Sequence, residues 1–314
     1  MALNATDDIR VPEVDLNTYK PTNPVEVEVV KSELATDTAS PNFVRHIEFD
    51  LTGTDLEGRM IPGQSMGILA EGLDEEGNPH KVRLYSTCSP SGGEDGSGRI
   101  FATTVKRVID EHWENHSLFL GVCSNYLCNL QPGDRVLMTG PSGKRFLLPD
   151  RYEEYNYIFL STGTGIAPFR GMITDLMRRG IDGEVILGFG CPYRTDLLYR
   201  NLFERFQREN HNFHYIPSIS REDPRPDGTK PYVQYTLIDR HDLMMPVLEK
   251  DNTLIYVCGL KGMETGIFQL LGQLGLFDYL RVNEELKDAN PLNWTREQLK
   301  RWVRPGERMF LEVY

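Results

Sequence analysis

The sequence predicts two domains, a small antiparallel β-barrel followed by a doubly wound parallel sheet with helices between its strands. Two observations lead to this prediction. Between Pro24 and Pro149, short segments of alternating polarity are separated by clusters of turn residues, which is typical of a small barrel. After Pro149, compact apolar segments alternate with helical stretches, which is typical of a parallel α/β sheet. The predicted division is a loosely ordered extension over residues 1–23, a barrel over residues 24–150 and an α/β domain over residues 151–314.

Two strands of the barrel can be placed from their pattern alone. Residues 25–29 read Val-Glu-Val-Glu-Val, so every second side chain is apolar, and residues 44–49 follow the same period more loosely. Glycine and other turn-forming residues gather at residues 75–79 and 91–96. The first half of the chain is therefore a series of short strands joined by turns.

The second half begins with an apolar strand at residues 157–160 and continues with a helix over residues 168–179. In a parallel sheet the carboxyl ends of the strands share one edge, and ligands bind there. The remaining elements that the pattern predicts are strands at residues 185–189, 213–216, 254–257 and 309–311 and a helix at residues 197–208.

Composition and charge exclude some classes of function. The formal net charge of −12 argues against nucleic acid as a general partner, although residues 296–308 hold five Lys or Arg residues against two Glu residues. No apolar run approaches the roughly 20 residues of a membrane helix. The first 24 residues resemble neither a secretion signal nor a transit peptide, so we expect a cytoplasmic location.

The spacing of cysteines and histidines predicts neither a disulfide framework nor a metal site. The five cysteines are an odd number, and Cys123 and Cys128 lack the further cysteines that an iron–sulfur cluster needs. The histidine pairs 112/116 and 211/214 do not form a recognisable zinc ligand set. We therefore expect no metal.

A glycine-rich turn follows the first strand of the second half. Residues 162–168 read Thr-Gly-Thr-Gly-Ile-Ala-Pro, in which glycine lets the backbone approach a ligand and Pro168 suits the first turn of a helix. A pyrophosphate at this helix N-terminus is one interpretation, because helix N-termini favour anions. A tight turn without a ligand is the alternative that this motif leaves open.

A polar segment after the third strand has the residue types of a site for the 2′-phosphate of NADP. Such a site needs cations, hydroxyl groups and an aromatic face, and Ser220, Arg221, Lys230 and Tyr232 supply them. The neighbouring Glu222 is the kind of residue that an NAD site would use instead. A solvated polar loop is a further alternative.

Single residues at strand ends are further candidates for a functional site. Cys258 would either face a nicotinamide or be a buried structural cysteine. Tyr314 is the last residue and follows a predicted strand, so it can have a fixed position. In the barrel, Arg83, Tyr85 and Ser86 can bind a phosphate, stack on a ring and donate a hydrogen bond to a flavin, but each is also an ordinary strand residue.

Six motifs occur in order along the chain. With them the sequence, from about residue 25 to its end, resembles the plant-type ferredoxin–NADP(+) reductase family, and the long loop at residues 71–79 resembles the plastidic branch. The motifs are Arg-Leu-Tyr-Ser at 83–86, Gly-Val-Cys-Ser-Asn-Tyr-Leu-Cys at 121–128, Gly-Pro-Ser-Gly-Lys at 140–144, Gly-Thr-Gly-Ile-Ala-Pro-Phe-Arg at 163–170, Cys-Gly-Leu-Lys-Gly-Met-Glu at 258–264 and the terminal Glu-Val-Tyr.

The resemblance implies a six-stranded FAD-binding barrel followed by an NADP(H)-binding α/β domain. It also implies hydride transfer between nicotinamide C4 and flavin N5, with Ser86, Cys258, Glu312 and Tyr314 around the reacting atoms. The FAD-binding residues that it implies are Arg83, Tyr85, Ser86, Lys106, Gly121, Val122, Cys123, Ser124, Thr164 and Tyr314. The NADP-binding residues are Thr164, Ser220, Arg221, Lys230, Tyr232, Gln234, Gly259 and Leu260.

Two positions depart from the pattern of the family. In relatives, a Tyr shortly after the Lys-Arg pair stacks on the FAD adenine, whereas this chain has Asp110, with His112 or Trp113 as substitutes. Ser161 stands where relatives often have Gly, a change that we expect to be tolerated.

The leading hypothesis is a monomeric flavoenzyme that moves electrons between NADP(H) and a separate acidic carrier, ferredoxin or flavodoxin. A reductase for an oxygenase or a cytochrome, and a non-catalytic redox-sensing flavoprotein, are the other hypotheses. The basic residues that could contact the carrier, or could simply be solvated, are residues 296–308, Lys106, Arg107, Lys144 and Arg145.

Overall fold

The computed structural model describes residues 9–314, which divide into two compact units. The barrel unit consists of residues 12–148 and 167–175. The sheet unit consists of the described residues before Pro12 together with residues 149–166 and 176–314. The grouping of residues 167–175 with the barrel is a feature that the sequence pattern does not predict.

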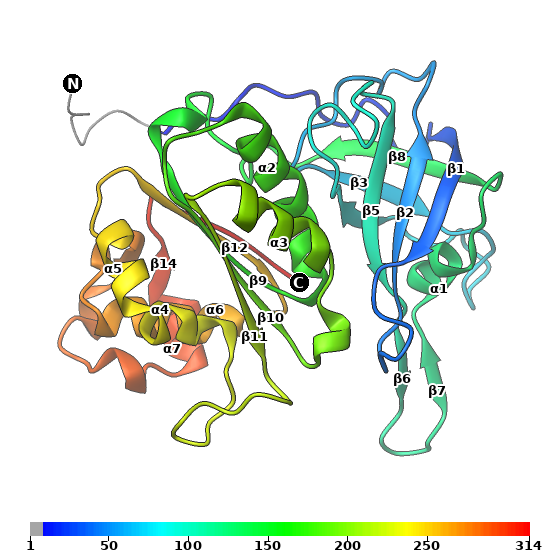
Figure 1. Cartoon of the computed structure of the whole chain (residues 1–314). Helices are drawn as coiled ribbons and strands as arrows, with labels where there is room; N and C mark the ends of the chain where they lie inside the picture. The colour runs from blue at the N-terminus through cyan, green and yellow to red at the C-terminus, as the bar shows by residue number, and fades with distance from the viewer. Residues whose placement is uncertain (1–8) are drawn as a thin grey trace. The chain divides into compact units, whose positions relative to one another are not determined.

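The barrel unit contains a six-stranded antiparallel sheet in the order β4-β3-β8-β1-β2-β5 (Figure 1). A bridge between Thr87 and Thr103 joins the two outer ends of this order, so the sheet closes on itself. The predicted antiparallel barrel is confirmed. Its strands are β1 (Val25–Leu34), β2 (Val44–Asp50), β3 (Ser65–Leu69), β4 (Arg83–Ser86), β5 (Ile100–Lys106) and β8 (Arg135–Ser142).

Alternating side chains fill the barrel. Val27 and Val29 of β1 are buried while the Glu residues beside them point outward or lie at the edge, as the period of two requires. They pack in one hydrophobic cluster with Phe49 and Phe101. Helix α1 (Val122–Asn129) contributes Cys123, Leu127 and Cys128 to the same cluster.

Residues 12–23 of the N-terminal extension belong to the barrel unit, whereas residues 9–11 belong to the sheet unit. Asn17 N–H donates to Pro141 O at 2.8 Å, and Tyr19 N–H donates to Gly140 O at 3.0 Å. Residues 17–19 therefore differ from the loose extension that the sequence predicts. Residues 1–8 lie outside the described residues.

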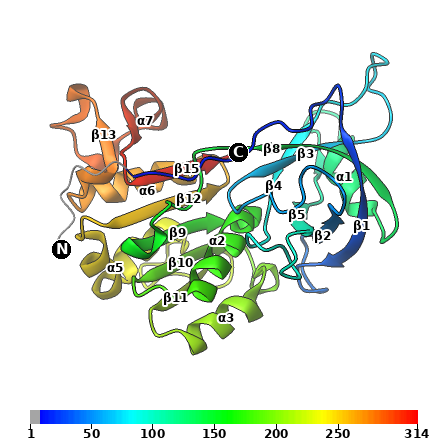
Figure 2. The ribbon, with the colours of Figure 1, turned by 90° about the horizontal axis from the view of Figure 1, so that it is seen from above.

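The sheet unit is built on a five-stranded sheet in the order β11-β10-β9-β12-β15, in which all neighbours are parallel. Figure 2 shows β15 alongside β12, with the C-terminus at its end. The predicted doubly wound sheet is confirmed. The strands are β9 (Asn156–Thr162), β10 (Val185–Cys191), β11 (Phe213–Ile219), β12 (Thr253–Gly259) and β15 (Met309–Val313), and the helices that follow β9 and β10 are α2 (Ile166–Arg179) and α3 (Arg200–Glu209).

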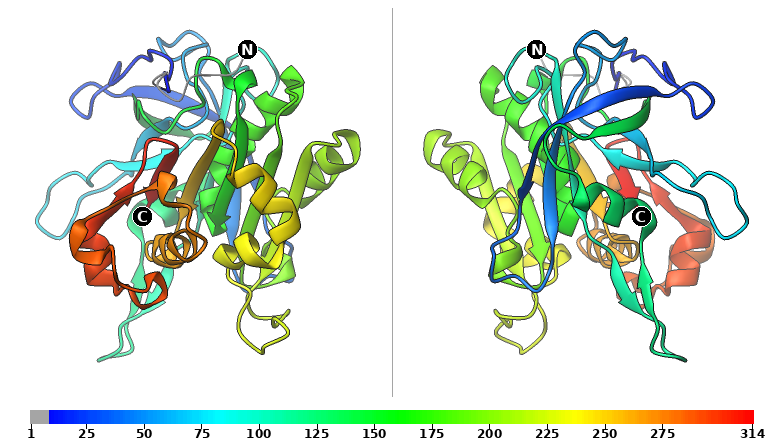
Figure 3. Two further views of the ribbon diagram at one scale, coloured as in Figure 1. Left: turned by 90° about the vertical axis from the view of Figure 1, so that its left-hand side faces the viewer. Right: turned by 90° about the vertical axis from the view of Figure 1, so that its right-hand side faces the viewer.

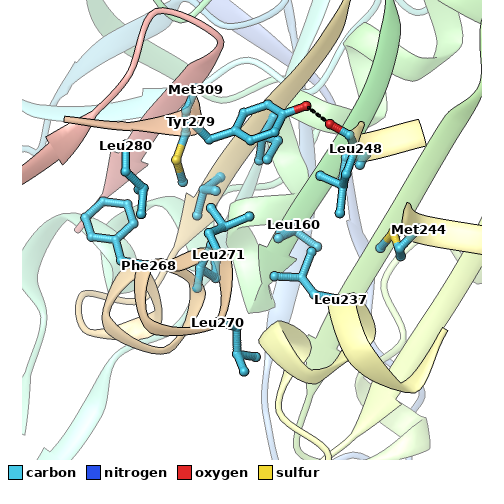
Figure 4. Close-up of a cluster of buried hydrophobic side chains, with 14 of the residues drawn as sticks. Leu160, Leu237, Met244, Leu248, Phe268, Leu270, Leu271, Tyr279, Leu280 and Met309 are labelled. Carbon is cyan, nitrogen blue, oxygen red and sulfur yellow. Dashed lines mark hydrogen bonds between the residues drawn. The ribbon is translucent and has the colours of Figure 1, made fainter. Parts of the chain in front are cut away.

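One face of this sheet carries a large hydrophobic core (Figure 4). Leu160 of β9 and Val257 of β12 pack there against the helices that follow β11 and β12. Tyr279 is fully buried in the core and satisfies its hydroxyl by donating to Leu248 O at 2.9 Å. The elements on this side are α4 (Thr236–Asp239), α5 (His241–Leu248), α6 (Met263–Gln273), α7 (Arg296–Trp302) and the short pair β13 (Leu280–Val282) and β14 (Val303–Pro305).

A short hairpin extends from the barrel, β6 (Ile109–Glu111) and β7 (Leu118–Leu120), and it is visible as the projecting teal ribbon in Figures 1 and 3. All six of its strand residues are exposed. Among residues 9–314, no helix has both the length and the apolar character needed to cross a membrane.

Candidate functional site

The carboxyl ends of β9, β12 and β15 bring four predicted site residues together. In the parallel registers, Cys258 of β12 lies between Ser161 of β9 and Glu312 of β15. Tyr314 follows β15, and its hydroxyl is hydrogen-bonded to Thr164 Oγ1 over 2.7 Å. Thr164, Cys258, Glu312 and Tyr314 therefore form one cluster at this edge of the sheet, which we call the sheet-edge cluster.

Tyr314 has a fixed position although it ends the chain. Its N–H donates to Gly259 O at 3.1 Å, and its carbonyl oxygen accepts from Lys261 N–H at 2.8 Å. The hydrogen bond to Thr164 holds the far end of the side chain. The residue as a whole is nevertheless 56% exposed, while burial of its phenol raises the pKa of Tyr314 to about 12.

Burial controls the charge of the cluster. It raises the pKa of Glu312, whose Oε2 atom is buried and has no hydrogen-bond partner among the described residues. Burial, together with the nearby Glu312 carboxylate, also raises the pKa of Cys258. A neutral thiol packs as a small apolar group, and a protonated carboxyl can donate a hydrogen bond. An unsatisfied buried carboxyl oxygen at a strand end fits a ligand that brings its own polar atoms.

Two glycines allow the turns at this edge to touch. A Cβ atom on Gly165 would lie 2.2 Å from Cys258 O, and one on Gly259 would lie 2.2 Å from Thr162 Oγ1. Helix α2 begins after Gly165, and no side chain caps its first N–H groups. Backbone that is this close, next to an uncapped helix N-terminus, suits an anionic part of a nucleotide.

The residues predicted to bind the 2′-phosphate lie beyond the ends of β10 and β11. The guanidinium of Arg221 donates to Tyr193 Oη at 2.9 Å and lies 5.4 Å from the centroid of that ring. Ser220 Oγ donates to Cys191 O at 3.3 Å. The sequence analysis missed Tyr193, although its place directly after β10, which pairs with β11, was the available signal.

Glu222, the residue that favoured an NAD site, is engaged elsewhere. Its carboxylate accepts a hydrogen bond from Arg194 N–H at 3.1 Å, and its Oε2 lies 3.6 Å from Arg194 Nε. Asp223 accepts from the same guanidinium at 2.6 Å. Arg194, a second residue that was missed, therefore holds both carboxylates that follow Arg221.

The remaining predicted NADP residues are spread over two loops. Lys230 and Tyr232 are exposed, and Gln234 packs against Gly266, where a Cβ atom would lie 2.8 Å from its Nε2. Leu260 is 62% exposed, and its N–H donates to Thr162 Oγ1 at 3.0 Å. The structure thus places Leu260 at the sheet-edge cluster and Lys230 and Tyr232 on the loop before α4.

In the barrel unit, β4 presents the predicted flavin residues in a row. Arg83 is exposed, and Tyr85 and Ser86 are half-buried. Burial raises the pKa of Tyr85, so its hydroxyl is a neutral donor. The carbonyl of Ser86 accepts from Thr103 Oγ1 at 2.8 Å, which ties the end of β4 to β5.

The start of α1 offers a second group of donors in this unit. Gly121 is the N-cap and provides no side-chain cap for Val122, Cys123 and the next N–H groups. Ser124 Oγ instead accepts from Val108 N–H at 3.2 Å and donates to Gly121 O at 3.0 Å. An uncapped helix start close to a basic strand residue has the donor chemistry of a pyrophosphate site.

The two basic residues at the end of β5, Lys106 and Arg107, have different surroundings. Lys106 is exposed. Arg107 donates to Asn129 Oδ1 at 2.7 Å and to Cys128 O at 3.1 Å, and its guanidinium lies 4.9 Å from the Phe43 ring centroid. Arg107 therefore helps to hold α1 on the barrel, which the sequence analysis did not foresee.

Within residues 9–314, one group of side chains has the spacing of metal ligands, namely His46, Cys88 and Glu94 in the barrel unit. His46 Nδ1 lies 3.5 Å from Cys88 Sγ. Arg170 donates to both oxygens of Glu94 at 2.7 and 2.8 Å. Because a cation already holds this carboxylate, the group fits a buried polar network better than a metal site.

Comparison with known proteins decides the family. Residues 159–269 match the model of the oxidoreductase NAD-binding domain. The chain is 38% identical to the ferredoxin–NADP reductase of Spirulina sp, over 85% of this chain and 92% of the relative. It is 36% identical to the chloroplastic leaf isozyme 1 of Arabidopsis thaliana, over 88% and 78% of the two chains. The chain belongs to the ferredoxin–NADP reductase family.

Solved structures agree with this family at the level of the fold. A ferredoxin–NADP+ reductase of Plasmodium falciparum superposes with a TM-score of 0.69 at 23% identity, over 95% of this chain and 99% of that one. Another structure of that protein contains 2′P-AMP. The predictions of the family, the enzyme class, the use of FAD and NADP(H) and a ferredoxin partner are confirmed.

Proposed function

We propose that electrons pass between NADP(H) and ferredoxin through a site to which the sheet-edge cluster contributes the nicotinamide-facing residues. The observation that carries this proposal is the junction of Thr164, Cys258, Glu312 and Tyr314, in which the terminal ring is fixed by a 2.7 Å hydrogen bond. When bound, FAD supplies the exchange of hydride with NADP(H) and of single electrons with the carrier. The protein supplies position and polarity.

Each residue of the cluster has a separate role in this proposal. Tyr314 presents its exposed ring in the place where a nicotinamide would stack, so it excludes water and competes with that ring. The neutral Cys258 thiol packs against the nicotinamide without adding charge. Glu312, with its raised pKa, can hold a proton and donate a hydrogen bond at the same edge.

FAD is proposed to occupy the barrel between β4 and the start of α1. There Arg83 and the uncapped N–H groups of α1 would hold phosphate oxygens, and Tyr85 and Ser86 would contact the flavin. The residues of the barrel unit proposed for FAD are Arg83, Tyr85, Ser86, Lys106, Gly121, Val122, Cys123 and Ser124. The two FAD residues expected in the sheet unit, Thr164 and Tyr314, stay predictions.

NADP(H) is proposed to bind the sheet unit with its 2′-phosphate near Arg221. The cation–aromatic pair of Arg221 and Tyr193 supports this position, and so does the engagement of Glu222 by Arg194, because that carboxylate already has a cationic partner. The full set proposed for NADP(H) is Thr164, Ser220, Arg221, Lys230, Tyr232, Gln234, Gly259 and Leu260, and the structure adds Tyr193.

The basic segment 296–308 supplies the proposed carrier contacts in the sheet unit. Its exposed members are Arg296, Lys300, Arg301 and Arg304. Arg308 is only 17% exposed and lies 4.5 Å from the Tyr279 ring centroid, so it serves the core instead. Lys106, Lys144 and Arg145 are the exposed candidates in the barrel unit.

The carrier can be identified by comparing acceptors. We expect NADPH to reduce cytochrome c rapidly only when ferredoxin or flavodoxin is added, and NADH to be a poor donor. Direct and equally fast reduction of cytochrome c without a carrier would favour a reductase that serves cytochromes. Slow NADPH oxidation with every acceptor would favour the non-catalytic alternative. Flavodoxin as a carrier, a monomeric state and a cytoplasmic location stay predictions.

A further inference from the structure

The hairpin of β6 and β7 is an exposed surface without an assigned role. Its strand residues are all exposed, and the four apolar ones, Ile109, Leu118, Phe119 and Leu120, are between 50% and 68% exposed. Isolated two-stranded hairpins gain little stability in water. Apolar side chains kept on such an element therefore indicate that a ligand or partner packs on it.

The register of the hairpin shows which side chains share a face. Asp110 pairs with Phe119, whereas Ile109 pairs with Leu120 and Glu111 with Leu118. Directly opposite residues in an antiparallel pair point to the same face, so Phe119 stands on the face of Asp110. The two other pairs form the opposite face.

Position 110 itself cannot provide a stacking surface. Asp110 has no ring, and its carboxylate accepts a hydrogen bond from Glu111 N–H at 2.8 Å. Phe119 lies across the strand pair and is 50% exposed. The ring of His112 packs at right angles to that of Phe119, with centroids 6.0 Å apart and an interplanar angle of 85°.

The hairpin leads directly into the proposed pyrophosphate site. Only Gly121 separates the end of β7 from α1, and Gly121 N–H donates to Val108 O at 3.0 Å, at the base of β6. The uncapped N–H groups of α1 are therefore tied to the base of the hairpin. The hairpin is thus the element next to the proposed phosphate donors of α1.

We infer that Phe119 stacks on the adenine of FAD and supplies, from the neighbouring strand, the aromatic surface that is missing at Asp110. The inference rests on the proposed binding of FAD to the barrel. Phe119 is then a positioning residue for the adenosine half and takes no part in the chemistry. Trp113, which is 95% exposed in the turn of the hairpin, has no such role.

The test measures the affinity of the flavin-stripped full chain for FAD and for FMN. Binding is monitored through the quenching of flavin fluorescence. Stacking on an aromatic side chain contributes about 1–3 kcal/mol per base, so Phe119→Ala should raise the Kd for FAD roughly 5- to 150-fold. The Kd for FMN should not change, because FMN lacks adenosine. Phe119→Tyr should keep the affinity of the wild type.

Two further variants sharpen the test. Trp113→Ala, the matched control on the same hairpin, should bind FAD as the wild type does. Asp110→Tyr in the Phe119→Ala background should restore FAD affinity, because the two positions share a face.

Three results would overturn the inference. They are unchanged FAD binding by Phe119→Ala, an equal loss for FAD and FMN, or a loss that follows Trp113 instead. A wild-type chain that takes up neither flavin would overturn the proposed function itself, so the two failures can be told apart.

Discussion

At the scale of single residues, Tyr314 shows how a chain terminus becomes part of a site. Three hydrogen bonds, to Thr164, Gly259 and Lys261, fix both its backbone and its hydroxyl. The ring would have to move before a nicotinamide could occupy the same place. The free energy of that movement is lost from nucleotide binding.

We therefore expect Tyr314→Ser to tighten NADP+ binding by about tenfold or more, which corresponds to about 1.4 kcal/mol. The variant should also improve the use of NADH, because the nicotinamide then contributes more to binding. Equilibrium titration with NADP+ and steady-state rates with NADH measure the two effects.

Tyr314→Phe is the matched control, since it keeps the ring and loses only the hydrogen bond to Thr164. It should bind NADP+ far more like the wild type than like Tyr314→Ser. Equal affinity of all three proteins would reject the role of the ring.

The sequence identified some site residues and missed others for a physical reason. Thr164, Cys258 and Tyr314 are candidates because of their places at strand ends, since parallel strands bring their carboxyl ends to one edge. Glu312 is a candidate only through the family resemblance. Tyr193 and Arg194 lie in a loop whose path depends on the packing of β10. No local pattern states that Arg194 would engage Glu222, so the sequence left the NAD alternative open.

At the scale of elements, helix α2 joins the barrel unit through a buried ion pair. Arg170 donates to both oxygens of Glu94 and to Cys88 O, and the two charged side chains are only 16% and 13% exposed. Burial alone would raise the pKa of Glu94, but the hydrogen bonds and charge of Arg170 lower it. Ser91 N–H donates to Asp175 Oδ2 at 3.0 Å from the same loop.

Arg170→Ala should destabilise the protein by about 3–5 kcal/mol, because it leaves the Glu94 carboxylate buried without its cation. Arg281→Ala removes an exposed partner of Glu307 and should cost at most about 1 kcal/mol. Urea denaturation of both variants measures the difference. A loss for Arg170→Ala no greater than that for Arg281→Ala would contradict the importance of this pair.

Elements with a strong hydrophobic pattern were predictable from the sequence, and short exposed elements were not. The strands β9, β10 and β12 can be recognised from the sequence. Both of their faces are buried, so their sequences are continuous apolar runs. The hairpin of β6 and β7 and the eight-residue helix α1 carry no comparable signal. The strand residues of the hairpin are all exposed, and α1 buries only Cys123, Ser124, Leu127 and Cys128. The role proposed for Phe119 follows only from the register of the hairpin.

At the scale of the whole chain, the order of strands and helices is enough to predict both folds. The predicted boundary near residue 150 is close to the end of the barrel segment at residue 148, but the sequence does not reveal that residues 167–175 pack with the barrel. That grouping depends on contacts such as the one between Arg170 and Glu94. The family motifs nevertheless lie on the elements that the proposed chemistry needs.

The most direct test of this account is the visible spectrum of the purified protein before and after anaerobic addition of NADPH. We expect a yellow protein with the absorption of oxidised flavin, whose released cofactor is FAD and whose colour is bleached by NADPH much faster than by NADH. A colourless preparation that takes up no FAD, or a bound flavin that NADPH does not reduce, would contradict the account.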